Sequence, residues 1–222
     1  DHYSELTPLL LSGGGLKTLE AVVDALEALD FDSLWLSERI SGEAPDPLVA
    51  MAYGAGRTTK VKFGMSVMVL PGRNPVVLAK ELATLATMSK GRLLPAFGLG
   101  AAEPIEHQAF GVERSERAAI FDEALQVMRQ CWTGEPFSHH GPRFHYDGVV
   151  VKPAPRRMDV WLGGIAPSEL KRVGRLADQA RRPCAFVEEL LARQRCALFC
   201  GSKKKLVRRV LAPNASPYTY SG

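Results

Sequence analysis

The stretch Gly91-Arg-Leu-Leu-Pro-Ala-Phe-Gly-Leu-Gly-Ala-Ala-Glu103 decides the fold class of this 222-residue chain. In it an apolar run leads directly into a glycine-rich turn that ends on a carboxylate. In folds that alternate strands and helices, ligands bind at the C-terminal ends of the parallel strands. The stretch therefore predicts that Gly98, Gly100 and Glu103 lie on the rim of a ligand-binding site.

The rest of the chain repeats strand and helix with a spacing of roughly 30 residues, which favours parallel βαβ units. Hydrophobic periodicity and helix-start signals predict strands at residues 6–11, 33–36, 61–70, 93–99 and 160–162. The same signals predict helices at residues 16–29, 47–57, 75–88, 115–132 and 167–177. Glycines, prolines and aromatic residues indicate a β-hairpin at residues 134–152, which interrupts this alternation.

Composition indicates a globular chain with one main core. Hydrophobic residues make up 46% of the sequence, which suffices for one sizeable core. No apolar run reaches the roughly 18 residues that span a bilayer, and Asp1-His-Tyr-Ser-Glu5 lacks the basic region of a signal peptide. We therefore expect a cytoplasmic protein without a membrane partner.

Charge and cysteine usage set the last part of the chain apart. Residues 179–222 hold nine lysines and arginines against two acidic residues, whereas the preceding body is mildly acidic. A basic segment can bind nucleic acid by releasing counterions, but no nucleic-acid motif accompanies it, so we interpret it as a solvated face. Cys196 and Cys200 lack a nearby histidine and form a poor zinc pattern. We expect free thiols, no metal site and no nucleic-acid partner.

Six short segments, taken in chain order, resemble the bacterial luciferase-like monooxygenase family, especially its deazaflavin-dependent oxidoreductases. They are Phe31-Asp-Ser-Leu-Trp-Leu-Ser-Glu38, Thr58-Thr-Lys-Val-Lys-Phe-Gly-Met-Ser-Val67, Arg73-Asn-Pro75, Ala79-Lys-Glu-Leu-Ala-Thr-Leu85, Gly91-Arg-Leu93 and Leu162-Gly-Gly164. The resemblance covers about residues 16–178. It implies a TIM (β/α)8-type barrel with ligands at its C-terminal mouth, in agreement with the alternation of strands and helices.

The barrel is expected to be incomplete or shortened at its C-terminal end. Eight strand–helix units need roughly 250 residues, and the residues after Asp178 are too few for three such units. We divide the chain into a luciferase-like barrel portion, 1–178, and a basic divergent tail, 179–222. Within this tail, Leu198-Phe-Cys-Gly-Ser202 resembles the family's final strand, so the tail could complete the barrel.

The resemblance also implies a binding site for a ring cofactor and its phosphate-bearing tail. The bond between Ser66 and Val67 matches a non-prolyl cis peptide that backs the ring in the family, although from the residues alone it is an ordinary strand bond. Glycine-rich turns let backbone amides approach an anion. The residues that we expect to bind the acidic tail are Gly98, Gly100, Ala101, Gly163, Gly164 and Ile165.

Two carboxylates are the catalytic candidates. Glu103 matches a carboxylate that handles a proton beside the ring in some members, and its alternative is a solvent-facing loop residue. Glu38 matches an acid that relatives follow with histidine, but Arg39 occupies that position here and cannot act as a base. Arg39 could pair with Glu38, bind an acidic group of the cofactor or substrate, or form a surface ion pair.

Other residues that suggest chemistry are interpreted as structural. We expect Trp35 and Trp161 to pack in the core. The four histidines that fall in predicted loops are expected to lack partners: His107, His139, His140 and His145.

The resemblance implies an oxidoreductase that uses coenzyme F420 for hydride transfer on a small organic substrate. An alternative is an FMN-dependent monooxygenase supplied by a partner reductase, and a third is a catalytically silent truncated barrel. Exposed barrel edges invite pairing with another chain. A homodimer is therefore expected on each of these interpretations.

Overall fold

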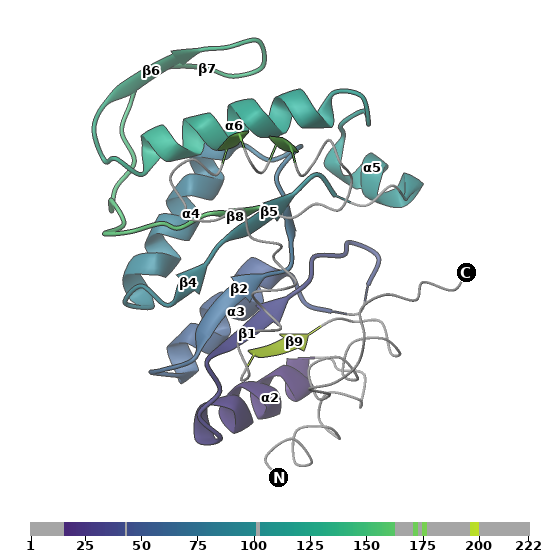
Figure 1. Ribbon diagram of the computed structural model, residues 1–222, viewed down its shortest axis with the longest axis vertical. Helices are drawn as coiled ribbons and strands as arrows, with labels where there is room; N and C mark the ends of the chain where they lie inside the picture. The colour runs from purple at the N-terminus through teal and green to yellow at the C-terminus, as the bar shows by residue number, and fades with distance from the viewer. Residues whose placement is uncertain are drawn as a thin grey trace.

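A computed structural model describes residues 16–42, 44–100, 103–162, 171–172, 175–176 and 196–199. Its parallel strands form two groups that run in the same curved layer (Figure 1). The first group, in spatial order, is β4 (Leu93–Leu94), β2 (Lys62–Met65), β1 (Ser33–Leu36) and β9 (Cys196–Phe199). The second group, in spatial order, is β3 (Met68–Val69), β5 (Ala96–Gly98) and β8 (Trp161–Leu162).

Two of the predicted strands are each divided into two pieces. The strand expected at 61–70 becomes β2 and β3, and the strand expected at 93–99 becomes β4 and β5. The first break lies at Ser66 and Val67, and the second lies at Pro95, which has no amide hydrogen to donate. Because β2 pairs with β4 and β3 pairs with β5, the same two chain segments stay parallel neighbours on both sides of the break.

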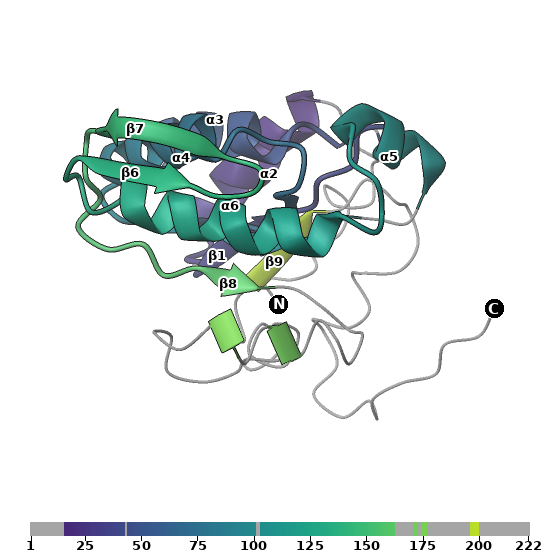
Figure 2. The same ribbon diagram turned by 90° about the horizontal axis from the view of Figure 1, so that it is seen from above.

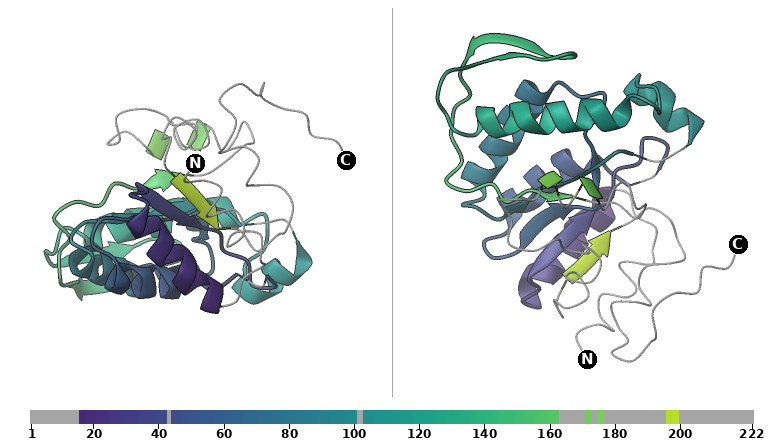
Figure 3. Two further views of the ribbon diagram at one scale, coloured as in Figure 1. Left: turned by 90° about the horizontal axis from the view of Figure 1, so that it is seen from below. Right: turned by 45° about the horizontal axis from the view of Figure 1, so that its top comes forward.

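Helices cover one face of this layer, as Figures 2 and 3 show from above and below. They are α2 (Leu16–Ala28), α3 (Pro47–Arg57) and α4 (Pro75–Met88), with α6 (Arg117–Cys131) beside α4. Asp46 accepts a hydrogen bond from the Val49 amide at the start of α3. Asn74 caps α4 in the same way. The predicted starts of both helices are therefore confirmed.

Two elements lie outside this strand–helix layer. The predicted β-hairpin is confirmed as β6 (Phe137–His140) paired antiparallel with β7 (His145–Val149). A short helix, α5 (Pro104–Phe110), follows Glu103 and was not predicted from the sequence. Glycine at position 111 ends α5 in the left-handed conformation, with φ of 61°.

The two faces of the strand layer bury different side chains. Leu34, Leu36 and Phe63 point to the helices and join the main hydrophobic core. Trp35 points to the opposite face, where its ring centroid lies 5.8 Å from that of Trp161 in an edge-on arrangement. This alternation follows from the two-residue period of a strand. Trp35 is therefore a buried packing residue, as expected, and Trp161 is half-buried against it.

Polar side chains tie the elements together at the N-terminal ends of the strands. The Arg92 guanidinium donates to Thr58 Oγ1 at 2.8 Å and also to the backbone carbonyls of Ala55, Thr58 and Val61. Glu27, near the end of α2, accepts hydrogen bonds from the backbone amides of residues 59–61. Although burial opposes ionisation, these hydrogen bonds lower the pKa of Glu27 to about 2.

The C-terminal segment joins the sheet beside β1. Strand β9 runs parallel to β1, with Ser33 opposite Cys196 and Leu36 opposite Phe199 (Figure 1). A closed barrel pairs its last strand with its first, whereas β1 corresponds to the second predicted strand. The first predicted strand, 6–11, lies outside the described residues. The predicted helix at 167–177 is described at 171–172 and 175–176, which are helical.

Candidate functional site

The C-terminal ends of the parallel strands bring together three loops that the sequence marked as functional. These loops follow β1, separate β2 from β3, and follow β5, whose end leads toward α5 in Figure 1. The peptide bond between Ser66 and Val67 is cis, as the family resemblance predicts. The Ser66 amide donates to the Leu36 carbonyl at 2.7 Å, and the Ser37 hydroxyl donates to the Ser66 carbonyl at 3.3 Å. These contacts hold the loop after β1 against the break between β2 and β3.

Two predicted glycines lie where side chains from the β2–β3 segment approach β5. A Cβ atom added to Gly98 would lie 2.5 Å from Val67 Cγ2, which is shorter than any ordinary contact. At Gly100, φ is +87° and an added Cβ would lie 3.0 Å from Val69 Cγ1. A side chain at Gly98 would displace Val67, and the left-handed backbone at Gly100 favours glycine. Four further predicted cofactor-binding residues lie outside the described residues: Ala101, Gly163, Gly164 and Ile165.

Glu38 is the buried carboxylate of this site. Its side chain is 2% exposed, accepts a hydrogen bond from the Val69 amide at 2.6 Å and pairs with the Arg73 guanidinium. Arg73 also donates to the Val69 carbonyl at 2.9 Å and lies over the ring of Phe110. Burial raises the pKa of Glu38, and this effect outweighs the opposing attraction of Arg73.

Arg39 and Glu103 form an ion pair at the surface of the same site. Their closest atoms, Arg39 Nη1 and Glu103 Oε1, are 3.2 Å apart, and the side chains are 44% and 57% exposed. Of the three interpretations of Arg39, pairing with Glu38 is wrong, because Glu38 pairs with Arg73. Glu103 occupies the N-cap position of α5, but its side chain makes no capping hydrogen bond. The ion pair joins the loop after β1 to the loop after β5.

Sequence reasoning missed three charged residues of the site. Arg73 lies within Arg73-Asn-Pro75, one of the segments that carried the resemblance, but nothing in the sequence paired it with Glu38. Glu106 and Arg117 are 3% and 7% exposed, respectively, although charged helix residues are normally solvated. Glu106 Oε1 accepts a hydrogen bond from the Ile40 amide at 3.2 Å. Arg117 Nη1 donates a hydrogen bond to the Leu99 carbonyl at 3.2 Å.

Two of the four histidines that were expected in loops have acidic partners. All four lie in secondary structure: His107 in α5, His139 and His140 in β6, and His145 in β7. The Nε2 atom of His139 lies 3.1 Å from Glu123 Oε1, and that of His140 lies 3.1 Å from Asp147 Oδ1. The expectation that the histidines lack partners is therefore wrong for these two. Glu123 also accepts from the Phe144 amide at 2.9 Å, so it anchors the hairpin to α6.

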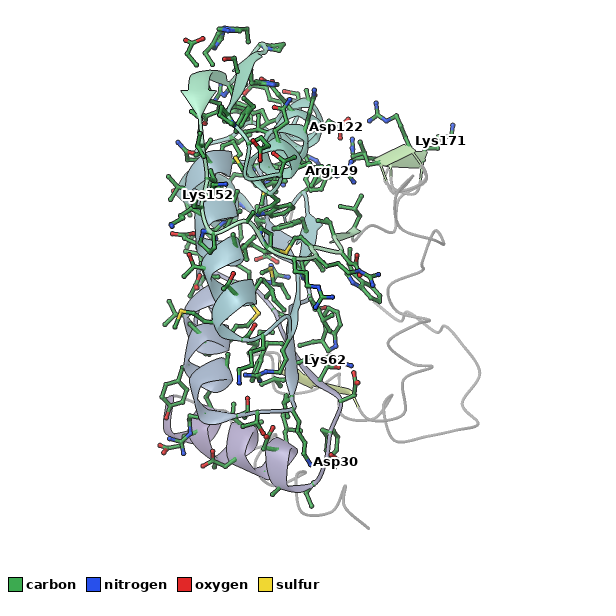
Figure 4. The ribbon with its side chains drawn as sticks, turned by 90° about the vertical axis from the view of Figure 1, so that its left-hand side faces the viewer. Asp30, Lys62, Asp122, Arg129, Lys152 and Lys171 are labelled. Carbon is green, nitrogen blue, oxygen red and sulfur yellow. The ribbon has the colours of Figure 1, made fainter. Side chains whose placement is uncertain are left out.

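A wide cleft of about 1410 Å³ lies away from the strand ends, between α6, the hairpin and residues 155–160. Asp122 and Arg129 of α6 line this cleft, and Figure 4 labels both on the side of α6 toward Lys171. Arg172 Nε lies 2.9 Å from Asp122 Oδ1 across this space. Ligands of strand–helix folds bind at the C-terminal strand ends, so we place the functional site at Glu38 and not in this cleft.

Within the described ranges, no group of three or more histidine, cysteine, aspartate or glutamate residues is arranged to hold a metal ion. The described helices also include none with the length and apolar character needed to cross a membrane.

A parallel strand layer covered by helices on one face, with polar loops gathered at the C-terminal strand ends, defines an α/β protein, the class to which TIM barrels belong. The sequence model of the luciferase-like monooxygenase family matches residues 4–180. This chain therefore belongs to the luciferase-like monooxygenase family.

The curated relatives of this chain include F420-dependent dehydrogenases. An F420-dependent glucose-6-phosphate dehydrogenase from Tsukamurella paurometabola is 32% identical over 177 residues, which are 74% of this chain and 52% of that protein. The chain thus spans about half the length of the curated relatives that it matches.

Two solved structures share the fold. An F420-dependent secondary alcohol dehydrogenase in complex with an F420-acetone adduct aligns with a TM-score of 0.63 and 25% identity, over 71% of this chain and 50% of that one. The oxygenating constituent of 3,6-diketocamphane monooxygenase from Pseudomonas putida, in complex with FMN, aligns with a TM-score of 0.63 and 21% identity. That alignment covers 74% of this chain and 52% of the other.

Proposed function

We propose that this chain is an oxidoreductase that binds coenzyme F420 at the C-terminal strand ends and acts by hydride transfer on a small organic substrate. The observation that carries the proposal is that Glu38, the Ser66–Val67 segment and Gly98 converge at the C-terminal ends of the strands. We call this end of the strand layer the mouth. Relatives that are named as F420-dependent dehydrogenases support the choice of cofactor. Coenzyme F420 supplies the hydride chemistry when it is bound, and the protein supplies binding, orientation and proton handling.

The residues present at the mouth fit an acidic coenzyme with a flat ring. Ser66 and Val67 are half-buried, so they can offer a hydroxyl and an apolar surface to one face of the ring. Arg39 is a half-exposed cation and can bind an acidic group of the coenzyme if it leaves Glu103. Gly98 and Gly100 keep the chain after β5 free of side-chain bulk.

Four further residues complete the proposed binding site for the acidic tail of the coenzyme. They are Ala101, Gly163, Gly164 and Ile165, and their assignment rests on the family resemblance.

Glu103 and Glu38 are the proposed acid–base residues, with different roles. Hydride transfer from an alcohol requires a base for the hydroxyl proton, and Glu103 is the accessible carboxylate at the mouth. Glu38 is enclosed and its pKa is raised by burial, so it can retain a proton at a higher pH than an exposed glutamate can. Arg39 cannot replace the family's histidine as a base, because its guanidinium stays protonated.

The test is a titration of the purified chain with F420 and with FMN, followed by turnover with the cofactor that binds. We expect micromolar binding of F420 and a fall in turnover of about 100-fold or more for Glu103→Gln. Glu113→Gln is the matched control, because Glu113 is an exposed glutamate outside the mouth. Unchanged turnover in Glu103→Gln would remove its catalytic role, and binding of neither cofactor would favour a catalytically silent barrel.

An FMN-dependent monooxygenase that receives reduced flavin from a partner reductase is the second candidate function. A solved structural neighbour contains FMN, which supports it. The absorbance spectrum of the bound cofactor separates the two, because a deazaflavin absorbs at a shorter wavelength than FMN. Stronger binding of FMN than of F420, with oxygen consumption, would establish this alternative.

We also propose that the chain forms a homodimer. Exposed strand edges pair readily with other chains, and β8 and β9 lie at the ends of their strand groups among the described strands. Sedimentation of the purified chain is expected to give twice the mass of one chain, and a monomer at micromolar concentration would contradict this.

A further inference from the structure

Two buried charged residues lie directly beneath the mouth, and no catalytic step described above uses them. Glu106 in α5 and Arg117 at the start of α6 are 3% and 7% exposed. Both line a small cavity together with Val69, Gly100 and Phe110. Burying a charge is costly unless it is paired or hydrogen-bonded. Each of these side chains therefore needs a structural or functional reason to be there.

Arg117 is bound to the loop after β5. Its Nη1 atom donates to the Leu99 carbonyl at 3.2 Å and to the Gly100 carbonyl at 3.4 Å. These carbonyls belong to the residues that connect β5 to Glu103. The guanidinium thus restrains the backbone of Leu99 and Gly100, directly after β5.

Glu106 is bound to the other loop of the mouth. Its Oε1 atom accepts from the Ile40 amide at 3.2 Å, so α5 holds the loop that carries Glu38 and Arg39. The contact crosses from the segment after β5 to the segment after β1. Together, Glu106 connects the loop after β1 to α5, and Arg117 connects the loop after β5 to α6.

We propose that Arg117 and Glu106 are positioning residues that hold the loops after β5 and β1 in the arrangement that binds the coenzyme. The inference rests on the proposed function for its consequence in binding, but its structural part holds without a cofactor. Hydrogen bonds from a guanidinium to two carbonyls are stronger than those between neutral groups. Loss of either anchor releases one loop without removing any residue that contacts the coenzyme.

The test compares Arg117→Lys, Arg117→Met and Glu106→Leu, which has no acceptor for the Ile40 amide, with controls at exposed positions, Arg114→Lys and Glu113→Leu. Amide hydrogen exchange of the cofactor-free chain is measured first. We expect about fivefold faster exchange at residues 98–100 in Arg117→Met and at residues 39–42 in Glu106→Leu. Arg117→Lys is expected to restore part of the protection, and the controls are expected to match the wild type.

The dissociation constant of F420 is then measured on the variants that melt within a few degrees of the wild type. We expect it to rise about tenfold in Arg117→Met and in Glu106→Leu. Unchanged exchange at both loops would overturn the inference. Faster exchange with an unchanged dissociation constant would also overturn it, because the loops would then be anchored for folding alone.

Failure of the proposed function is recognised separately. If the wild type binds no F420, that function fails, and the exchange measurement still decides whether the two charges position the loops.

Discussion

A glutamate near each end of the parallel strands accepts hydrogen bonds from backbone amides, yet the pKa values of these two glutamates move in opposite directions. Glu27, at the N-terminal end, is hydrogen-bonded by the amides of residues 59–61, and its pKa falls to about 2. Glu38, at the C-terminal end, is almost fully enclosed, and burial raises its pKa despite Arg73. One environment fixes a charge, and the other makes the charge costly.

This difference matches the division of roles between the two ends of the strands in TIM-type barrels. The N-terminal ends of the strands serve stability, and the C-terminal ends carry binding and catalysis. Arg92 belongs with Glu27, because its guanidinium satisfies carbonyls of α3 and of the loops before β2. Changes at the first end should therefore alter the free energy of unfolding, and changes at the second should alter ligand binding.

The largest expected effect on stability is that of Arg92→Ala. It leaves the carbonyls of Ala55, Thr58 and Val61 without their donor, and each buried acceptor that loses its partner costs about 1–3 kcal/mol. We expect the free energy of unfolding to fall by about 3–5 kcal/mol in urea titrations. A variant of the exposed Arg157, Arg157→Ala, serves as the control and should have a much smaller effect. A loss below that of this control would contradict the assignment of Arg92 to the stabilising end.

The next effect is a pH dependence that comes from Glu27. Its folded-state pKa of about 2 lies below the unfolded value of 4.5, so its contribution is present above pH 4.5 and is lost as the pH falls through 2. With allowance for solvent screening, we expect about 2 kcal/mol at most. Unfolding measured from pH 6 to pH 2 should show a shallower fall in Glu27→Gln than in the wild type. Parallel curves for the two proteins would remove this role.

Glu38 should give the opposite slope. Its folded-state pKa is raised, so the folded chain binds more protons than the unfolded chain and stability falls as the pH rises from 4.5 through the folded-state pKa. Glu38→Gln should remove this fall, and unfolding curves measured from pH 4 to pH 8 test it. At pH 7 the stability gained by Glu38→Gln is reduced, because the substitution also removes the ion pair between Glu38 and Arg73. A steeper loss of stability with rising pH in this variant would contradict the raised pKa.

The smallest expected effect on stability is that of Arg39→Gln. Its ion pair with Glu103 is exposed, and such pairs contribute about 0–1 kcal/mol. Thermal unfolding should therefore change by no more than a few degrees, and the difference should vanish in high salt. A large loss of stability would show that the pair holds the mouth together.

Local signals predicted most of the helices and strands. Asp46 and Asn74, each followed by proline, mark the starts of α3 and α4, and the short apolar run at 33–36 is β1. These features depend on neighbouring residues in the chain. The division of two strands did not follow from periodicity, because the segments 61–70 and 93–99 each look like one strand, and Ser66 and Pro95 do not show that each pairs in two pieces.

The candidate site was only partly predictable, because its pairs join residues far apart in the chain. Glu38 and Arg39 are adjacent, yet one pairs with Arg73 and the other with Glu103. Nothing in the sequence says which neighbour is buried. The link between Glu123 and His139 was missed for the same reason, since it depends on where the hairpin crosses α6.

Two glycines provide the most direct test that the C-terminal strand ends bind the coenzyme. A Cβ atom at Gly98 would lie 2.5 Å from Val67 at the mouth, and one at Gly54 would lie 2.5 Å from Phe63 on the helix-covered face. We therefore measure the dissociation constant of F420 for the wild type, Gly98→Ala and Gly54→Ala. The prediction is micromolar binding by the wild type, binding at least about tenfold weaker in Gly98→Ala, and an unchanged constant in a less stable Gly54→Ala. Equal weakening in both variants, or no binding by the wild type, would contradict it.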